Sequence, residues 1–208
     1  MKFGSAALVG GTTAAGMASA AAGYYAFSPS DKEERAISSL LSEDPSRRAI
    51  ADNEDWSSAW SKYKASNKDV WDLKNSDANA PEVFKTACKN RLESKVSGKD
   101  SEGYRDFVSY CTRDTKVSDL IKDAGKTVLI KSGNEAQWKA AWERYRLAHQ
   151  GSGTDPWTID KFSENKSKAD QPASEDFQNK CVERLDRASI SDVELIDEVT
   201  KWCTVEGK

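Results

Sequence analysis

Apolar side chains recur at helical spacing along most of this chain, and one aromatic pattern occurs twice. Residues 56–63 read Trp-Ser-Ser-Ala-Trp-Ser-Lys-Tyr, and residues 138–145 read Trp-Lys-Ala-Ala-Trp-Glu-Arg-Tyr. The aromatic positions of each segment are four and three residues apart, so they share one face of a helix. We therefore predict two equivalent helices, whose buried faces carry Trp56, Trp60 and Tyr63 in the first and Trp138, Trp142 and Tyr145 in the second.

Two further patterns follow each aromatic helix in the same order. The first is Phe-x3-Cys-x2-Arg-Leu, which begins at Phe84 and again at Phe177. The second is an aromatic residue followed by Cys-Thr, at 110–112 and at 202–204. Three patterns that recur in one order, with different lengths only between them, predict a tandem duplication. The expected organisation is a junction at 28–35, a first helical repeat at 36–115 and a second at 116–208.

Helical spacing in nearly every apolar stripe predicts an all-α fold, with about four helices in each repeat. Ser30 and Glu33 have the form of a capping box that would begin a helix ending at Leu41. Ser191 and Glu194 have the same form before the last apolar stripe. Residues 67–79 and the stretch from 151 to 174 are expected to be loops, while 127–130 is compatible with helix or strand.

The N-terminal segment is predicted to cross a membrane. Residues 3–27 contain no charged side chain. As a helix they would extend about 37 Å, which exceeds the ~30 Å hydrocarbon thickness of a bilayer. A single-pass transmembrane anchor at 1–27 is the preferred interpretation, and a cleaved secretory signal with Ala-x-Ala sequences at 18–20 and 20–22 is the alternative. Both interpretations make the bulk of the chain extracellular.

Charge and composition narrow the range of partners. The 31 lysine and arginine residues nearly balance the 34 aspartate and glutamate residues, the formal net charge is −3, and the two signs are mixed along the chain. Phosphate binding requires a concentrated positive surface, so we expect no nucleic acid partner.

Repeats of this size bury a modest core and tend to need extra stabilisation. Seven tryptophans and one cysteine pair in each repeat could supply it.

Each predicted repeat has one cysteine in its third helix and one at the end of its fourth. These cysteines are Cys88 and Cys111 in the first repeat, and Cys181 and Cys203 in the second. An exported chain with an even cysteine count and one pair per repeat favours a disulfide within each repeat. Four buried free thiols are the alternative. A zinc site is not expected, because the chain has no Cys-x2-Cys and a single histidine.

The repeated aromatic faces have two interpretations. We expect them to pack with Phe84 and Phe177 in the core, because helical spacing is typical of a buried face. Stacking platforms for a sugar or another aromatic ligand are the alternative. Trp71 and Trp157 fall in loops and are better candidates for exposed contact residues.

Few residues are candidates for chemistry. Arg91 and Arg184 follow their cysteines by three residues, and we expect an ion pair or a hydrogen bond to a loop carbonyl rather than a bound anion. His149 has no counterpart in the first repeat. No serine hydrolase, P-loop, zinc protease or dinucleotide motif occurs, and one histidine supplies no obvious general base for a nucleophile. We therefore expect no catalytic residue, no metal and no cofactor.

The chain has an alanine- and glycine-rich N-terminal segment, a short polar junction, Trp-x3-Trp-x2-Tyr and Cys-x2-Arg-Leu patterns and a closing aromatic-Cys pair. This layout resembles the large paralogous families of uncharacterised exported proteins in haemotropic mycoplasmas. The resemblance covers the whole chain, although many members have the unit once. It implies a surface-anchored protein of a wall-less bacterium that lives on red blood cells, and it implies no activity for any residue.

The leading hypothesis is a membrane-anchored extracellular protein that contacts host surface or plasma proteins or serves as a variable antigen. An exported hydrolase that uses a carboxylate pair is one alternative. An envelope or export assembly factor is the other.

Overall fold

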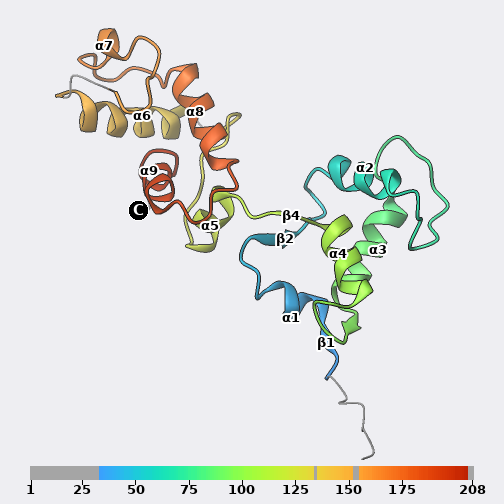
Figure 1. Cartoon of the computed structure of the whole chain (residues 1–208). Helices are drawn as coiled ribbons and strands as arrows, with labels where there is room; N and C mark the ends of the chain where they lie inside the picture. Colours follow the sequence, from blue (N-terminus) through green and yellow to red (C-terminus); the bar gives the residue numbers. More distant parts are fainter. Residues whose placement is uncertain (1–32, 134, 152–154, 206–208) are drawn as a thin grey trace, which may run out of the picture. The chain divides into compact units, whose positions relative to one another are not determined.

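Figure 1 shows the computed structural model of the chain, which describes residues 33–133, 135–151 and 155–205. Within these ranges the chain is mainly α-helical, with nine helices and four strands of two or three residues. The predicted anchor at 1–27 lies outside the described residues. No helix in the described part is long and apolar enough to cross a membrane. The helical class is confirmed, and the short strands correct the all-α prediction.

We refer to residues 33–115 as the N half and to residues 116–205 as the C half. The N half contains β1 (Arg35–Ala36), α1 (Ile37–Leu41), β2 (Arg47–Ala49), α2 (Ser57–Ala65), α3 (Glu82–Leu92), β3 (Lys95–Val96), α4 (Glu102–Cys111) and β4 (Thr112–Asp114). Antiparallel pairing joins β1 to β3 and β2 to β4. The strand that begins the N half thus pairs with the strand after α3, and the strand that ends it pairs with the strand after α1.

The C half contains α5 (Val117–Asp123), α6 (Glu135–His149), α7 (Phe162–Asn165), α8 (Glu175–Leu185) and α9 (Val193–Trp202). Its counterpart of the β2–β4 pairing is a single bridge between Val128 and Thr204. The Leu129 N–H also donates to the Cys203 carbonyl at 2.8 Å. The ambiguous segment 127–130 is thus extended rather than helical.

Each half has its own hydrophobic cluster, centred on a phenylalanine of its cysteine helix. Every aromatic residue predicted for the core has at most 5% of its surface exposed: Trp56, Trp60, Tyr63, Phe84, Trp138, Trp142, Tyr145 and Phe177. The Phe84 ring lies 6.0, 5.0 and 5.2 Å from the rings of Trp56, Trp60 and Tyr63. The Phe177 ring lies 6.2, 5.3 and 5.3 Å from those of Trp138, Trp142 and Tyr145. The repeated aromatic faces are therefore core.

The cysteines form the two predicted pairs. Cys88 and Cys111 have an S–S distance of 1.98 Å and a Cα–Cα distance of 5.4 Å. Cys181 and Cys203 have corresponding distances of 2.09 and 5.5 Å. Both Cα separations are usual for a disulfide. In each half the bond joins the cysteine helix to the end of the following helix, and no described cysteine is free.

Two predicted helix starts need correction. The described helix that ends at Leu41 begins at Ile37, because residues 35–36 pair with β3 and the Ile37 N–H donates to the Ser94 carbonyl at 3.0 Å. The last helix is capped by Asp192 rather than Ser191, since the Asp192 carboxylate accepts from the Leu195 N–H at 3.0 Å. The first start depends on pairing with a segment distant in sequence, and the second on Asp192 rather than Ser191 providing the cap.

A cluster of charged side chains joins β2 and β4 to α5. The Arg113 guanidinium pairs with Glu54 at 2.5 Å and with Asp119 at 2.6 Å. Arg48 pairs with Asp123 and lies 3.8 Å from Asp119. Burial disfavours both charged forms in the Arg113–Asp119 pair, yet their mutual hydrogen bonds prevail, so the pKa of Arg113 is raised and that of Asp119 is lowered.

Candidate functional site

The C-terminal end of α2 carries a tyrosine whose hydroxyl organises the following loop. The Tyr63 hydroxyl donates to Asp69 Oδ1 at 2.7 Å and accepts from the Trp71 N–H at 3.0 Å. Asp69 also accepts from the N–H groups of Leu73 and Lys74 at 2.9 and 3.0 Å. We call this Tyr–Asp–Trp arrangement the N clamp. It holds the indole of Trp71 against the aromatic cluster, with its ring 5.0 Å from that of Tyr63.

The loop of the N clamp has an unusual backbone. Asn67, Asp69, Asp72 and Lys74 have φ values of 53°, 39°, 52° and 50°. Residues other than glycine adopt positive φ values at a cost in free energy, and they keep them where surrounding contacts hold the backbone in place. The Asp69 carboxylate provides those contacts, since it accepts three hydrogen bonds from within the clamp and its loop.

The protonation states of the N clamp follow from its contacts. The Lys74 N–H and then the Tyr63 hydroxyl hold the pKa of Asp69 below its ordinary value. Burial, with the hydrogen bond to Asp69, raises the pKa of Tyr63 to about 12. At neutral pH the tyrosine is therefore a neutral donor and the aspartate an ionised acceptor.

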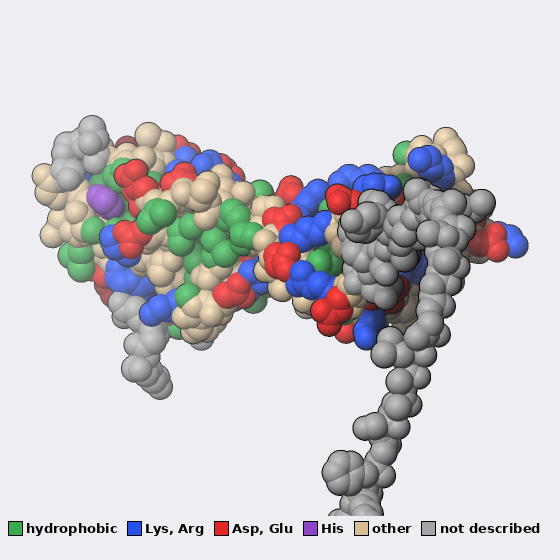
Figure 2. All heavy atoms as spheres, turned by 60° about the horizontal axis from the view of Figure 1, so that its bottom comes forward, with side chains coloured by type: hydrophobic (Ala, Val, Ile, Leu, Met, Phe, Trp, Pro, Cys, Tyr) green, Lys and Arg blue, Asp and Glu red, His purple; other side chains and the backbone are tan. Residues whose placement is uncertain are grey.

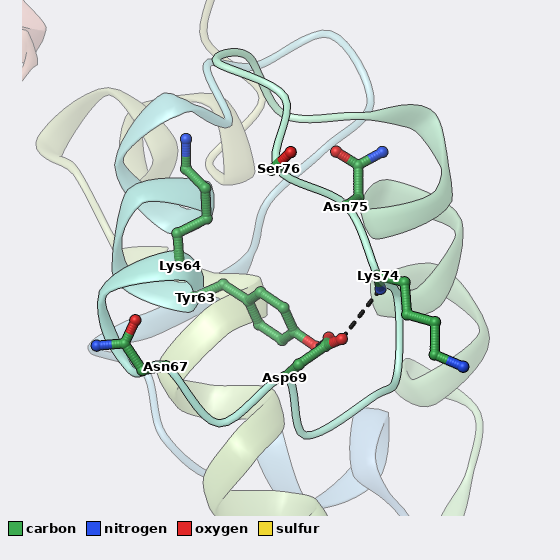
Figure 3. A pocket seen from close by; sticks show the side chains of 7 residues that line it. All are labelled: Tyr63, Lys64, Asn67, Asp69, Lys74, Asn75 and Ser76. Atoms are coloured by element: carbon green, nitrogen blue, oxygen red, sulfur yellow. Dashed lines mark hydrogen bonds between the residues drawn. The ribbon is translucent and has the colours of Figure 1, made fainter.

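A surface cavity of about 410 Å³ opens beside the N clamp. Figure 3 shows its lining, in which Lys64 and Asn67 come from the end of α2 and the turn after it, Lys74, Asn75 and Ser76 come from the returning segment, and Tyr63 and Asp69 lie between them. This volume is within the range of small-ligand sites. We call this space the N cavity.

One ammonium group and one carboxylate, those of Lys64 and Asp69, lie at the N cavity, whereas the Lys74 side chain points away from it (Figure 3). The Lys64 ammonium donates to the carbonyls of Asp77 and Ala78 at 2.9 and 3.4 Å, and it lies 5.4 Å from the centre of the Trp60 ring. The Lys74 ammonium is 3.2 Å from Asp72, and both side chains are more than three-quarters exposed. An exposed pair of this kind contributes little energy, so Lys74 can exchange its partner readily.

The C half has a clamp of the same composition, which we call the C clamp. The Tyr145 hydroxyl donates to Asp155 and accepts from the Trp157 N–H at 3.2 Å, and the Ile159 N–H donates to Asp155. Burial raises the pKa of Tyr145 above its ordinary value. The two aspartates were not among the residues predicted for a site. Their signal was the spacing Asp-x-Trp-x-Leu at 69–73 and Asp-x-Trp-x-Ile at 155–159.

The outer sides of the two clamps differ. In the C half, α7 brings Phe162 against the C clamp, with its ring 6.0 Å from that of Trp142 and 5.9 Å from that of Tyr145. Only 6% of the Phe162 surface is exposed. The N half has no helix between α2 and α3, and the N cavity opens there.

The arginines and tryptophans singled out in the sequence contact one another. The Arg91 guanidinium lies 4.4 Å from the Trp71 ring, and that of Arg184 lies 4.3 Å from the Trp157 ring. Their Nη1 groups donate to Ala87 and Lys180 carbonyls of their own helices, at 3.2 and 3.4 Å, rather than to loop carbonyls. Trp157 is 2% exposed, so its prediction as an exposed contact residue is wrong, and Trp71 is half-buried.

His149 packs beside the C clamp. Its ring lies 4.6 Å from that of Tyr145 and 5.6 Å from that of Trp202.

The described residues contain no group of histidine, cysteine and acidic side chains suited to a metal ion. Five of the surface cavities beside described residues are each lined by at most one carboxylate.

Comparison with known proteins supplies no relative for this chain. No protein-family model matches it, and neither a curated protein nor a solved structure matches it.

Proposed function

We propose that this chain is a membrane-anchored extracellular binding protein, made of two copies of one disulfide-closed helical module. It would contact host surface or plasma proteins, or serve as a variable antigen, as the resemblance to exported proteins of haemotropic mycoplasmas implies. The N cavity is its candidate binding site. The observation that carries the proposal is the recurrence of the same closed scaffold in both halves, with an open cavity beside one clamp.

Equivalent contacts support the duplication. The Ile37 N–H donates to the Ser94 carbonyl at 3.0 Å, and the Val117 N–H donates to the Arg187 carbonyl at 2.8 Å. The Ile50 N–H donates to the Cys111 carbonyl, as the Leu129 N–H donates to the Cys203 carbonyl. The Trp56 indole donates to the Ala51 carbonyl, as the Trp138 indole donates to the Ile130 carbonyl. The Thr112 hydroxyl donates to the Val108 carbonyl, as the Thr204 hydroxyl donates to the Thr200 carbonyl. These matches extend over most of both halves.

The disulfides and the N-terminal segment support an extracellular location. Disulfides persist in oxidising surroundings and are rare in reducing ones. Each half closes one such bond between its last two helices. An uncharged segment at 3–27 ahead of these halves has the length of a membrane anchor. An anchored chain with its bulk outside satisfies both observations.

Surface chemistry favours binding over hydrolysis. On the face drawn in Figure 2, basic and acidic side chains lie interspersed. A hydrolase based on a carboxylate pair needs two carboxylates facing one cleft, whereas the N cavity offers one, Asp69. An envelope or export assembly factor would share the scaffold, and it differs from our proposal in the partner it binds.

Location and binding can be tested separately. On intact cells that express the full chain, an impermeant amine-reactive reagent should label lysines of both halves, and labelling that requires cell lysis would contradict the extracellular location. For binding, the full chain in lipid vesicles should bind erythrocytes or immobilised plasma proteins in a saturable manner. Vesicles carrying reduced and alkylated protein serve as the matched control. Equal binding by that control would remove the host-contact function.

A further inference from the structure

The Cys88–Cys111 disulfide lies in the wall of a surface cavity of about 360 Å³, which we call the disulfide cavity. Both cysteines line this cavity. The rest of its wall is mostly apolar and comes from β2 and the segment after it, from α3 and from Phe107 of α4. The volume is within the range of small-ligand sites, so a small molecule that enters the cavity meets the bonded cysteines.

The C half allows a residue-by-residue comparison with this wall. The matched hydrogen bonds of the Cys111 and Cys203 carbonyls, and those of the two indoles, align residues 49–51 with residues 128–130. The N half has Ala-Ile-Ala at these three positions, and the C half has Val-Leu-Ile. The C half therefore has larger side chains at two of the three places beside its disulfide.

The residues around the C-half disulfide are also more deeply buried. Leu129 is 4% exposed and Leu185 is 6% exposed. Their counterparts Ile50 and Leu92 are half-buried, and both line the disulfide cavity. The two bonds thus occupy the same place in the scaffold under different cover.

The exposure of the cysteines follows the same order. Cys181 and Cys203 are both 0% exposed, whereas Cys88 is 3% and Cys111 is 1% exposed. A disulfide exchanges when a thiolate attacks one of its sulfurs, so the rate depends on whether the thiolate can reach that sulfur. The N-half bond meets this condition through the disulfide cavity.

We propose that the N-half disulfide is a modification site for a small thiol, and that the C-half disulfide is protected from the same reaction. The thiolate of the small thiol forms a bond to Cys88 Sγ, the more exposed of the two bonded cysteines. The electron pair of the original S–S bond leaves on Cys111 Sγ, which takes a proton from water. The incoming sulfur is oxidised as the Cys111 sulfur is reduced, so the step needs no further oxidant or reductant.

This inference goes beyond the proposed binding function, because it gives one half of the scaffold a reaction that the other half lacks. Cys111 is the last residue of α4, and β4 follows it directly and pairs with β2. Exchange at the N-half bond would detach this end of α4 from α3. The modification would therefore loosen the N half and leave the C half closed.

The experiment uses the full-length chain in detergent micelles, with both disulfides closed and without denaturant. Reduced glutathione is added, samples are quenched with excess N-ethylmaleimide, and peptide masses show which cysteines carry glutathione or the maleimide. We expect the Cys88–Cys111 bond to open at least about tenfold faster than the Cys181–Cys203 bond. Low urea concentrations should change the N-half rate little, because entry through the cavity requires no unfolding.

Two reciprocal double variants test the route. Ala49→Val with Ala51→Ile gives the N half the side chains of the C half, and it should slow N-half exchange about tenfold by narrowing the cavity. The C-half rate in the same molecule is the internal control and should not change. Val128→Ala with Ile130→Ala should make C-half exchange faster. Amide hydrogen exchange in the helices that carry the cysteines confirms that each variant is folded.

Three results would overturn the proposal. The first is equal exchange at the two disulfides of the original chain. The second is an N-half rate that rises with urea as steeply as global unfolding does, since the bond would then open only in unfolded molecules. The third is an unchanged N-half rate in folded Ala49→Val/Ala51→Ile, which would exclude the disulfide cavity as the route of entry.

Discussion

The loops that follow α2 and α6 hold the same Tyr–Asp–Trp clamp, but only the second is covered by a helix. In the C half, α7 places Phe162 edge-on against Tyr145 of the clamp and against Trp142, and Trp157 is buried and donates its indole N–H to Glu198 at 3.1 Å. In the N half, Trp71 is half-buried and the N cavity lies open. The contacts that both loops share position the aromatic core, whereas the covering can vary independently of it.

This comparison separates scaffold from site. A group that occurs in both halves, such as the clamp aspartate or the stacked arginine, is explained by folding alone. A group that only one half has, such as Phe162 of α7, is not explained by the shared scaffold. Matched substitutions in the two halves can therefore test which contacts belong to the scaffold.

The largest expected effect comes from the central phenylalanines. Phe84 and Phe177 are both fully buried among aromatic rings. Replacing either with alanine should lower the free energy of unfolding of its half by about 4 kcal/mol, because a large cavity remains. Hydrogen exchange resolved by residue measures each half separately. A substitution that lowers protection equally in both halves would show that they unfold as one unit, and a loss below about 2 kcal/mol would contradict the shared core.

Removing a disulfide should have the next largest effect. The Cys88–Cys111 and Cys181–Cys203 bonds span 23 and 22 residues. Replacing both cysteines of either pair with alanine should cost about 3 kcal/mol, and nearly the same amount in each half because the closed loops differ in length by a single residue. Urea unfolding of the two double variants measures this. A difference above about 1.5 kcal/mol would mean that one half depends on its bond through strain or through residual unfolded structure.

Much of this scaffold was predictable from the sequence, because its signals are local. Helical spacing identified the aromatic core, and cysteine placement identified the disulfides. The clamps were missed, since a hydrogen bond between Tyr63 and Asp69 depends on a turn with positive φ that neither propensity nor periodicity specifies. The N cavity was not predictable either, because it depends on the path of the loop that returns past the end of α2. The same tertiary dependence explains why Trp157 is buried although it lies in a loop.

An intermediate effect is expected from the charged cluster at Arg113, which pairs with Glu54 and Asp119. The Arg113→Met variant should lose about 2 kcal/mol at neutral pH, the usual size for hydrogen bonds to charged groups. Burial works against both carboxylates, yet their hydrogen bonds to Arg113 prevail and lower each pKa. The control is Arg187→Met, which breaks an exposed pair with Glu183 and should change stability little.

The pH dependence of that effect has a definite sign. Carboxylates whose pKa is lowered on folding stabilise the fold above their ordinary values, here 4.5 for Glu54 and 3.8 for Asp119, and the stabilisation is lost as the pH falls through the lower folded values. As the pH falls below about 4.5, the midpoint temperature of thermal unfolding should therefore decrease more steeply for the original chain than for Arg113→Met. Parallel curves would show that the cluster adds no net stability.

The smallest expected effect comes from the arginines stacked on the clamp tryptophans, and it depends directly on the difference between the halves. Arg184 faces a buried Trp157 and Arg91 a half-buried Trp71. A cation above an indole stabilises more when solvent is excluded, so Arg184→Met should cost about 1.5 kcal/mol and Arg91→Met about 0.5 kcal/mol. Residue-resolved hydrogen exchange in each clamp loop measures both values, with Arg91→Lys and Arg184→Lys as charge-retaining controls. A reversed order would contradict the expectation that the cation stabilises more at the more deeply buried tryptophan.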